Sequence, residues 1–237
     1  MAFAVVADAH LGGPGGPADP LVRQLDDLRF RDCEQLVLLG DLFQVWVGNP
    51  RFETADIAAV VAALRRVRED GIPVHYIEGN RDFFVAGSSY ENVFDTVGDE
   101  LAITSGGKRY LAIHGDGINE KDHLYRFWRR VSKNRLSRMA MNRLPLWLAR
   151  RLVFGFEREL GKTNFKHKKN LPQEVILDFA RSRLAEGFDA LILGHFHEPF
   201  RRSLDRGEVI VLDAWFRSQR VEWLAGGAEE RPSHGSA

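Results

Sequence analysis

Six short apolar runs have the length and composition of β-strands, and they constrain the fold more than any other feature of the chain. They are rich in Val, Ile, Leu and Tyr and cover residues 3–7, 36–39, 74–77, 110–113, 190–193 and 209–212. Segments with helical spacing lie at 18–31, 54–70 and 172–186. Strands that are apolar on both faces need helices on both sides of their sheet. The pattern therefore predicts a layered α/β sandwich, with helices outside one or two mixed sheets.

Residues of metal-binding type follow five of these runs, where each strand is expected to end. They are Asp8 and His10, then Asp41, Asn80 and His114, and finally His195 and His197. Taken singly, a strand-end Asp is usually a cap, and Gly-Asn-Arg-Asp at 79–82 is an ordinary turn sequence. Sites in open α/β sheets form beyond the carboxyl ends of the strands, where these residues would converge. Because the coincidence recurs at five strand ends, we predict a metal site there.

The ligand types indicate which ions such a site would hold. Imidazole, carboxylate and amide groups without a thiolate suit Mn²⁺, Fe²⁺ or Zn²⁺ better than Ca²⁺. Seven candidate ligands are enough for two ions if one carboxylate bridges them. Metal pairs about 3.5–4 Å apart promote displacement at phosphorus. Asn80 would complete the coordination of the second ion with a neutral oxygen, which adds no negative charge to repel a phosphate.

Composition limits the cellular setting and the number of domains. The single cysteine, Cys33, excludes an internal disulfide framework and fits a reducing compartment. The chain starts without a secretion signal, and no run reaches the ~18 apolar residues of a membrane span. We therefore expect a cytoplasmic protein with one domain over residues 1–237, ending in a disordered polar tail at 226–237.

Charge is distributed unevenly, although the chain is neutral overall. Residues 121–169 contain fifteen Lys and Arg against three acids, so the remainder carries the opposite excess of twelve negative charges. This block interrupts the strand and helix alternation, and we interpret it as a helical, basic cap insertion. Its helices could pack one apolar stripe on the core. The stretch "LPLWLARRLVFGF" has an apolar face too wide for that, which favours peripheral association with an anionic membrane surface.

The ordered motifs D-x-H, GD, GN, HGD and GHxH, from Asp8 to His197, resemble those of the calcineurin-like metallophosphoesterases. Finer details are similar to one family within them, the UDP-2,3-diacylglucosamine hydrolases. These details are the arginine after the asparagine in "GNRDF", the stretch "LGDLFQVW", and "HGDGINEKDHLYRFWR". The resemblance implies an α/β/β/α sandwich with a helical cap.

The resemblance also implies a dinuclear site, usually with Mn²⁺. One ion would be held by Asp8, His10, Asp41 and His197, and the other by Asp41, Asn80, His114 and His195. A hydroxide held between the ions would hydrolyse the pyrophosphate of UDP-2,3-diacylglucosamine, giving UMP and 2,3-diacylglucosamine 1-phosphate (lipid X), a lipid A precursor.

Further roles are implied for residues around the ions. Catalytic roles would fall to Asp41, Asn80, Arg81 and His114, and Arg81 would also contact phosphate oxygens. The remaining substrate contacts would come from Asp122, Tyr125, Asn164, Lys166, Lys168 and Lys169. The partners would be the lipid-linked nucleotide sugar and the cytoplasmic face of the inner membrane, with no stable nucleic-acid partner.

The chain departs from this family at a few positions, and other functions stay open. The family commonly has an apolar residue, often the larger Leu, at the position of Ala9. It commonly has an acidic pair where this chain has Gly48, Asn49 and Pro50. Another phosphoesterase, acting on nucleotides or other pyrophosphates, would keep the metal site and change only the cap. A nucleic-acid-processing enzyme would explain the basic block and needs an aromatic stacking groove rather than an acyl pocket. A non-catalytic scaffold is disfavoured because all seven candidate ligands are present.

Overall fold

The computed structural model describes residues 2–149, 151–152, 155 and 172–225. Its strands are β1 (Ala2–Val6), β2 (Cys33–Leu38), β3 (Trp46–Val47), β4 (Val74–Ile77), β5 (Asp82–Phe83), β6 (Thr96–Gly98), β7 (Glu100–Ser105), β8 (Lys108–Ile113), β9 (Ala190–Leu193), β10 (Phe200–Ser203), β11 (Glu208–Val211) and β12 (Glu222–Ala225). The α-helices are α1 (Asp19–Asp26), α2 (Ala55–Glu69), α3 (His123–Ser132), α4 (Arg135–Arg143), α6 (Gln173–Leu184) and α7 (Trp215–Ser218). Short 3₁₀ helices are η1 (Leu28–Phe30), η2 (Pro50–Phe52) and η3 (Glu91–Val93).

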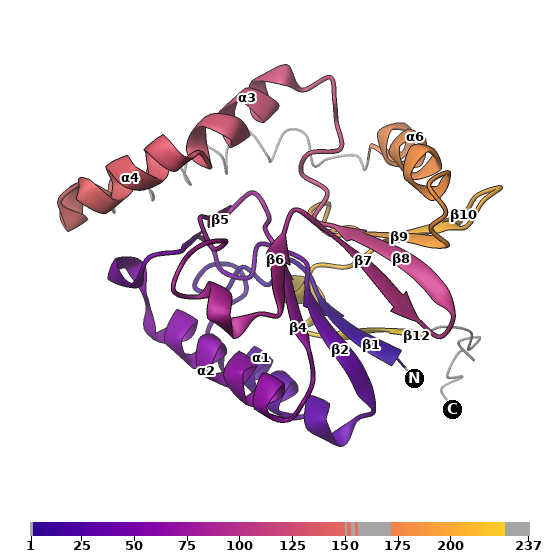
Figure 1. The fold of residues 1–237 in the computed structure, drawn as a ribbon, viewed down its shortest axis with the longest axis horizontal. Helices are drawn as coiled ribbons and strands as arrows, with labels where there is room; N and C mark the ends of the chain where they lie inside the picture. The colour runs from indigo at the N-terminus through magenta and orange to yellow at the C-terminus, as the bar shows by residue number, and fades with distance from the viewer. Residues whose placement is uncertain (1, 150, 153–154, 156–171, 226–237) are drawn as a thin grey trace.

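Two five-stranded mixed sheets form the centre of the molecule (Figure 1). The first has the order β12-β1-β2-β4-β6, and the second has the order β10-β11-β9-β8-β7. In the first sheet β1, β2 and β4 pair in parallel, and in the second β8, β9 and β11 do so. Each parallel set therefore directs its carboxyl ends to one edge of its sheet.

Side-chain alternation along β1 explains the layering. Phe3 and Val5 pack between the two sheets, in a cluster that includes Ile192 from the second sheet. Ala4 and Val6 point the other way, into the cluster that the first sheet forms with α1 and α2. Because successive residues of a strand face opposite sides, a continuous apolar run is buried on both.

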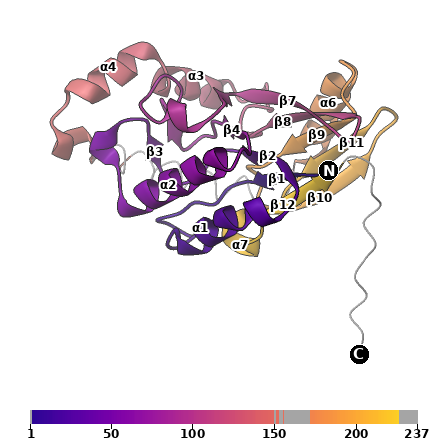
Figure 2. The ribbon, with the colours of Figure 1, turned by 60° about the horizontal axis from the view of Figure 1, so that its bottom comes forward.

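Helices cover the outer face of each sheet (Figures 1 and 2). α1 and α2 pack on the first sheet, and α6 packs on the second. α2 begins where Oγ1 of Thr54 accepts a hydrogen bond from the backbone N–H of Ile57 at 3.3 Å. It ends before Gly71, which has a φ of +85° that L residues rarely adopt. The layers are thus helix, sheet, sheet and helix, and the predicted α/β/β/α sandwich is confirmed.

The predicted cap begins with α3 and α4, which extend beyond β5 (Figure 1). Neither helix has a buried residue. The chain after α4 contacts the core through a small apolar cluster that includes Ala149 and Phe84. Cations make further cap-to-core contacts; they are Arg129, Lys133 and Arg138 from the cap and Arg51 from the core. The described part of the cap is therefore attached to the core by both polar and apolar contacts.

Large apolar side chains of the cap stay exposed to solvent. They are Leu124, Phe127, Trp128, Leu136, Met139, Trp147 and Leu152. Among the described residues, no helix combines the length and apolar content needed to span a bilayer. The rest of the predicted cap, from 156 to 169, and the predicted tail at 226–237 lie outside the described residues. The single-domain division stays a prediction.

Candidate metal centre

The seven predicted ligands lie in the loops that follow β1, β2, β4, β8 and β9. Five of them are buried: Asp8, His10, Asp41, Asn80 and His114. His195 and His197 are partly buried. The two sheets thus direct their strand ends to one place.

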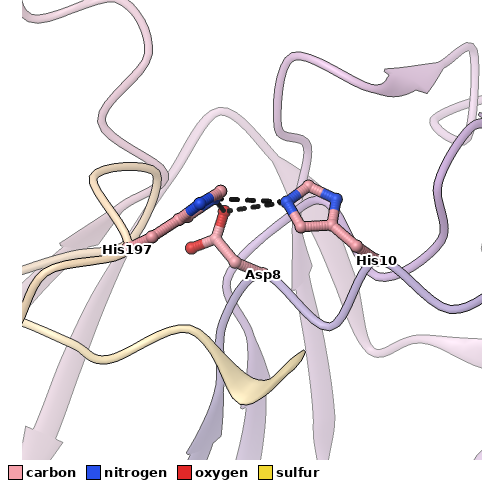
Figure 3. A group of neighbouring side chains, drawn as sticks. All are labelled: Asp8, His10 and His197. Carbon is pink, nitrogen blue, oxygen red and sulfur yellow. Dashed lines mark hydrogen bonds and ion pairs between the residues drawn. The ribbon is translucent and has the colours of Figure 1, made fainter. Parts of the chain in front are cut away.

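One group consists of Asp8, His10 and His197 (Figure 3). Nε2 of His10 lies 3.2 Å from Nε2 of His197, and the latter also lies 3.2 Å from Oδ1 of Asp8. Oδ1 of Asp8 is 3.9 Å from Nε2 of His10. The ring of Phe216 packs against both imidazoles, with centroid distances of 5.5 and 5.0 Å. Two nitrogens and a carboxylate oxygen therefore converge on one point, with an aromatic ring beside them.

A second group consists of Asp8, Asp41 and His114. Nδ1 of His114 lies 2.8 Å from the carbonyl oxygen of Leu39, which can only accept a hydrogen bond. Nδ1 therefore carries a proton, and Nε2 faces the site. Nε2 lies 3.3 Å from Oδ1 of Asn80 and 3.7 Å from Oδ1 of Asp41.

His195 joins this second group from β9. Its ring centroid lies 5.2 Å from that of His114, and its backbone N–H donates to Oδ2 of Asp8 at 2.7 Å. Asp8 is therefore the carboxylate common to both groups, whereas the family resemblance implies Asp41 as the bridge. The bridging role of Asp41 stays a prediction.

Burial and neighbouring charges oppose one another at these carboxylates. Burial raises the pKa of Asp41, and the nearby Asp8 raises it further. Burial acts in the same direction on Asp8, but His197, His114 and His10 outweigh it and hold the pKa of Asp8 below its usual value. Burial lowers the pKa of His114, but Asp41 and Asp8 outweigh it and raise the value. Two buried carboxylates this close are stable when cations compensate them.

The geometry therefore fits divalent metal ions. A neutral imidazole would aim its Nε2 lone pair at the carboxylate and amide oxygens near His114, and a cation among these atoms removes that repulsion. Buried N and O donors without sulfur are the ligands of Mn²⁺, Fe²⁺ and Zn²⁺. The residues present can hold such ions.

The backbone at the site is strained at five of the seven predicted ligands. Positive φ angles occur at Asp8 (51°), His10 (45°), Asp41 (52°), His195 (65°) and His197 (58°). Each residue held in this left-handed conformation costs about 1–2 kcal/mol of free energy. Strain of this kind persists where the surrounding structure holds it, and it is concentrated at functional sites.

Asp82 holds part of this backbone in place, a role that its sequence context did not predict. Its fully buried Oδ2 accepts hydrogen bonds from the backbone N–H groups of Asp41, at 2.9 Å, and Gly79, at 2.7 Å. Burial and the nearby Asp41 raise the pKa of Asp82 to about 7. A Cβ atom on Gly79 would lie 2.3 Å from Oδ1 of Asp41, so only glycine allows this approach. The sequence signal was the Asp of Gly-Asn-Arg-Asp, which reads locally as a turn residue.

Arg81 lies against the second group. Its backbone N–H donates to Oδ1 of Asp41 at 2.8 Å, and its Nε lies 3.6 Å from Oδ2 of the same carboxylate. Its Nη1 donates to the carbonyl oxygen of Gln44 at 3.2 Å. The guanidinium group is therefore held beside the candidate metal ligands.

The predicted substrate residues of the cap fall into two sets. Asp122 caps α3 by accepting from the backbone N–H of Tyr125 at 2.9 Å. The hydroxyl of Tyr125 donates to Asp116, which follows His114 in the HGD motif and also accepts from Nε of Arg129 at 2.9 Å. These contacts attach α3 to the site. Asn164, Lys166, Lys168 and Lys169 lie outside the described residues.

Comparison with known proteins places the chain and its fold in a class. The calcineurin-like phosphoesterase family matches residues 1–199, and the chain belongs to it. The chain is also similar to a phosphoesterase from E. coli, Yfce, with 17% identity, a TM-score of 0.45 and coverage of 96% of this chain and 100% of that one.

Two curated relatives point to one group within this class. One, from Edwardsiella ictaluri, is 31% identical over 230 residues, which cover 91% of this chain and 85% of the relative. Another, from Xanthomonas oryzae pv. oryzae, is 30% identical over 239 residues, covering 93% and 94%. Both are named UDP-2,3-diacylglucosamine hydrolase, and the chain belongs to their family.

Proposed function

We propose that the protein is a metal-dependent hydrolase that cleaves the pyrophosphate of UDP-2,3-diacylglucosamine, releasing UMP and 2,3-diacylglucosamine 1-phosphate. The observation that carries the proposal is the pair of candidate metal groups that share Asp8, built at the ends of strands from both sheets. The family relationship supplies the substrate.

The residues of the chain have distinct tasks in this proposal. Divalent ions bound at the site would supply charge neutralisation at the phosphoryl oxygens and activation of a water molecule. Asp8, Asp41 and the four histidines would hold the ions, and Asn80 would contribute a neutral oxygen. Arg81, already oriented by Asp41 and Gln44, donates to the phosphate oxygens as charge develops on them.

The metal is Mn²⁺ in this proposal, as is usual in the family. Mn²⁺ accepts the mixed N and O donor set at the strand ends. The whole set of metal ligands, including Asp41 as the bridge between the ions, is part of the same proposal.

The cap serves the lipid part of the substrate. Its exposed apolar side chains, such as Phe127 and Trp147, would enter the headgroup region of the anionic membrane that holds the acyl chains of the substrate. Nearby Lys and Arg side chains each add about 1 kcal/mol of attraction to such a surface. The protein would thus act in the cytoplasm, bound peripherally to the inner membrane. The cap lysines Lys166, Lys168 and Lys169, together with Asn164, would contact the substrate.

Product analysis tests this function directly. Purified protein with Mn²⁺ and UDP-2,3-diacylglucosamine should yield UMP and 2,3-diacylglucosamine 1-phosphate in the mass spectrum. Deacylated UDP-glucosamine should be cleaved much more slowly. Equal cleavage of both substrates would favour a phosphoesterase that acts on nucleotides or other pyrophosphates.

A further inference from the structure

Lys133 reaches from the cap into the loop that carries Asn80 and Arg81. It directly follows Ser132, the last residue of α3, and precedes α4. Its side chain is only 13% exposed, which is unusual for a lysine beside a helix that has no buried residue. Its Nζ donates to the carbonyl oxygen of Gly79 at 2.7 Å and lies 3.8 Å from Oε2 of Glu78.

The peptide groups of Gly79 are thereby held from two directions. The N–H of Gly79 donates to the buried carboxylate of Asp82, which also binds the N–H of Asp41. The carbonyl of Gly79 accepts from Lys133, and this carbonyl belongs to the peptide that joins Gly79 to Asn80. The core fixes one side of the loop and the cap fixes the other.

Glu78 extends the same arrangement. Its Oε1 accepts from the backbone N–H groups of Val85, at 2.7 Å, and Ala86, at 3.1 Å. Lys133 neutralises this carboxylate, which is only 12% exposed. The ammonium group of Lys133 therefore contacts both Gly79, at the start of the loop, and Glu78, whose carboxylate binds the backbone at the far end of the loop.

We propose that Lys133 is a positioning residue that orients the Gly79–Asn80 peptide, so that the cap sets how Asn80 is presented to the metal ion. The proposal rests on the proposed metal site and goes beyond it, because it assigns to a cap residue a role in metal binding. Lys133 acts through the backbone of Gly79 and does not itself contact the ion.

Metal binding without substrate tests this role. Metal-free wild-type protein and variants are titrated with Mn²⁺ alone, and free Mn²⁺ is measured by electron paramagnetic resonance. Lys133→Met keeps the aliphatic part of the side chain and removes the donor, and it should weaken Mn²⁺ binding at one of the two sites roughly tenfold or more. Lys133→Arg restores a donor and should recover part of the loss.

A matched control separates positioning from attachment of the cap. Nη1 of Arg51 donates to the carbonyl oxygen of Asn142 at 2.9 Å, and its Nη2 donates to that of Leu144 at 3.0 Å, so it too joins cap to core through carbonyls. Arg51→Gln should loosen the cap and leave Mn²⁺ affinity within about twofold of wild type, since it does not touch the loop at 78–82.

The outcomes distinguish the proposals. Wild-type Mn²⁺ affinity in Lys133→Met, or an equal loss in Arg51→Gln, would overturn the role of Lys133. If Lys133→Met does not fold, as judged by thermal unfolding, Lys133→Gln replaces it, because its amide group ends one atom short of the position of the lysine nitrogen and so withdraws the donor. A wild-type protein that binds no Mn²⁺ would overturn the metal site itself.

Discussion

Arg81 and Asp41 contact each other through both backbone and side chain. The N–H of Arg81 donates to one oxygen of the Asp41 carboxylate at 2.8 Å, and its guanidinium Nε lies 3.6 Å from the other. The strand end that delivers Asn80 thus also places a rigid cation next to a candidate metal ligand. These contacts hold the guanidinium group of the arginine that follows the asparagine in the GNRD loop, and substitution of Arg81 tests its role.

Arg81→Lys should lower kcat on the order of 10², the cost of removing a preorganised donor. Lysine keeps the charge but cannot contact the carbonyl of Gln44, the carboxylate of Asp41 and a phosphate with one planar group. Steady-state kinetics measure the effect. Arg66→Lys, at an exposed pair with Asp26, is the control and should retain full turnover. Undiminished turnover in Arg81→Lys would make the arginine merely structural.

Asp41→Asn should abolish hydrolysis and reduce the amount of bound metal. Asparagine has the same shape and can still accept from the N–H of Arg81, so the fold should persist. It lacks the negative charge that a bridging ligand needs. Metal content after dialysis and turnover are measured together, with Asp26→Asn as the surface control. Near-normal turnover would remove the two-metal interpretation.

The double variant Phe127→Ser and Trp147→Ser should weaken binding to anionic vesicles roughly tenfold or more, since burying each such side chain is worth about 1.5–3 kcal/mol. The two side chains are 56% and 68% exposed, so thermal stability should change little. Cosedimentation at low and high salt measures binding, which should weaken with salt.

Phe30→Ser is the matched control for this surface. Phe30 is 75% exposed but lies in η1, outside the cap. It should leave vesicle binding unchanged. If the wild-type protein stays in the supernatant at low salt, membrane association through the cap is excluded.

Asp95 should contribute to stability at neutral pH and lose that contribution in acid. Burial raises its pKa, but hydrogen bonds from Arg68, at 2.9 and 3.1 Å, and from the N–H of Val74, at 2.8 Å, outweigh it and lower the value. A lowered pKa in the folded state stabilises the protein above the unfolded value of about 3.9, and the benefit disappears as pH falls through the folded value.

Asp95→Asn should therefore reduce the free energy of unfolding at pH 7 by about 1 kcal/mol or less, because the ion pair with Arg68 is partly exposed. The difference from wild type should shrink as pH falls below about 4. Denaturant unfolding between pH 3 and 7 measures it. The double variant Arg68→Gln and Asp95→Asn should lose less free energy of unfolding than the two single variants lose together. A difference that is constant with pH would contradict the role of the charge.

Much of this fold was predictable because its strands and main helices are specified by local patterns. All six predicted strands appear as β1, β2, β4, β8, β9 and β11, and the predicted helices appear as α1, α2 and α6. Apolar runs and capping residues such as Thr54 act over a few neighbours, so they can be read from the chain. The identities of the candidate ligands were equally visible, because each lies in the loop that follows a strand.

The arrangement of the site needed contacts between distant segments. Asp8 meets His197 across 189 positions, and this contact makes Asp8 common to both groups. The left-handed backbone at Asp8 and Asp41 is locally unfavourable, so no local pattern predicts it. Hydrogen bonds to other segments stabilise it, among them the one that the N–H of Asp41 donates to the carboxylate of Asp82.

The cap also combines features that the sequence predicts with contacts that only the tertiary structure decides. Its basic and apolar composition was plain in the sequence, but the use of each cation was not. Lys133 contacts a carbonyl 54 positions earlier, whereas the apolar Trp147 remains exposed nearby in the chain. Composition sets which groups can form polar or apolar contacts. Which partner each group meets depends on how the sheets and the cap pack, because long-range contacts form only when their gain exceeds the entropy of closing the intervening chain.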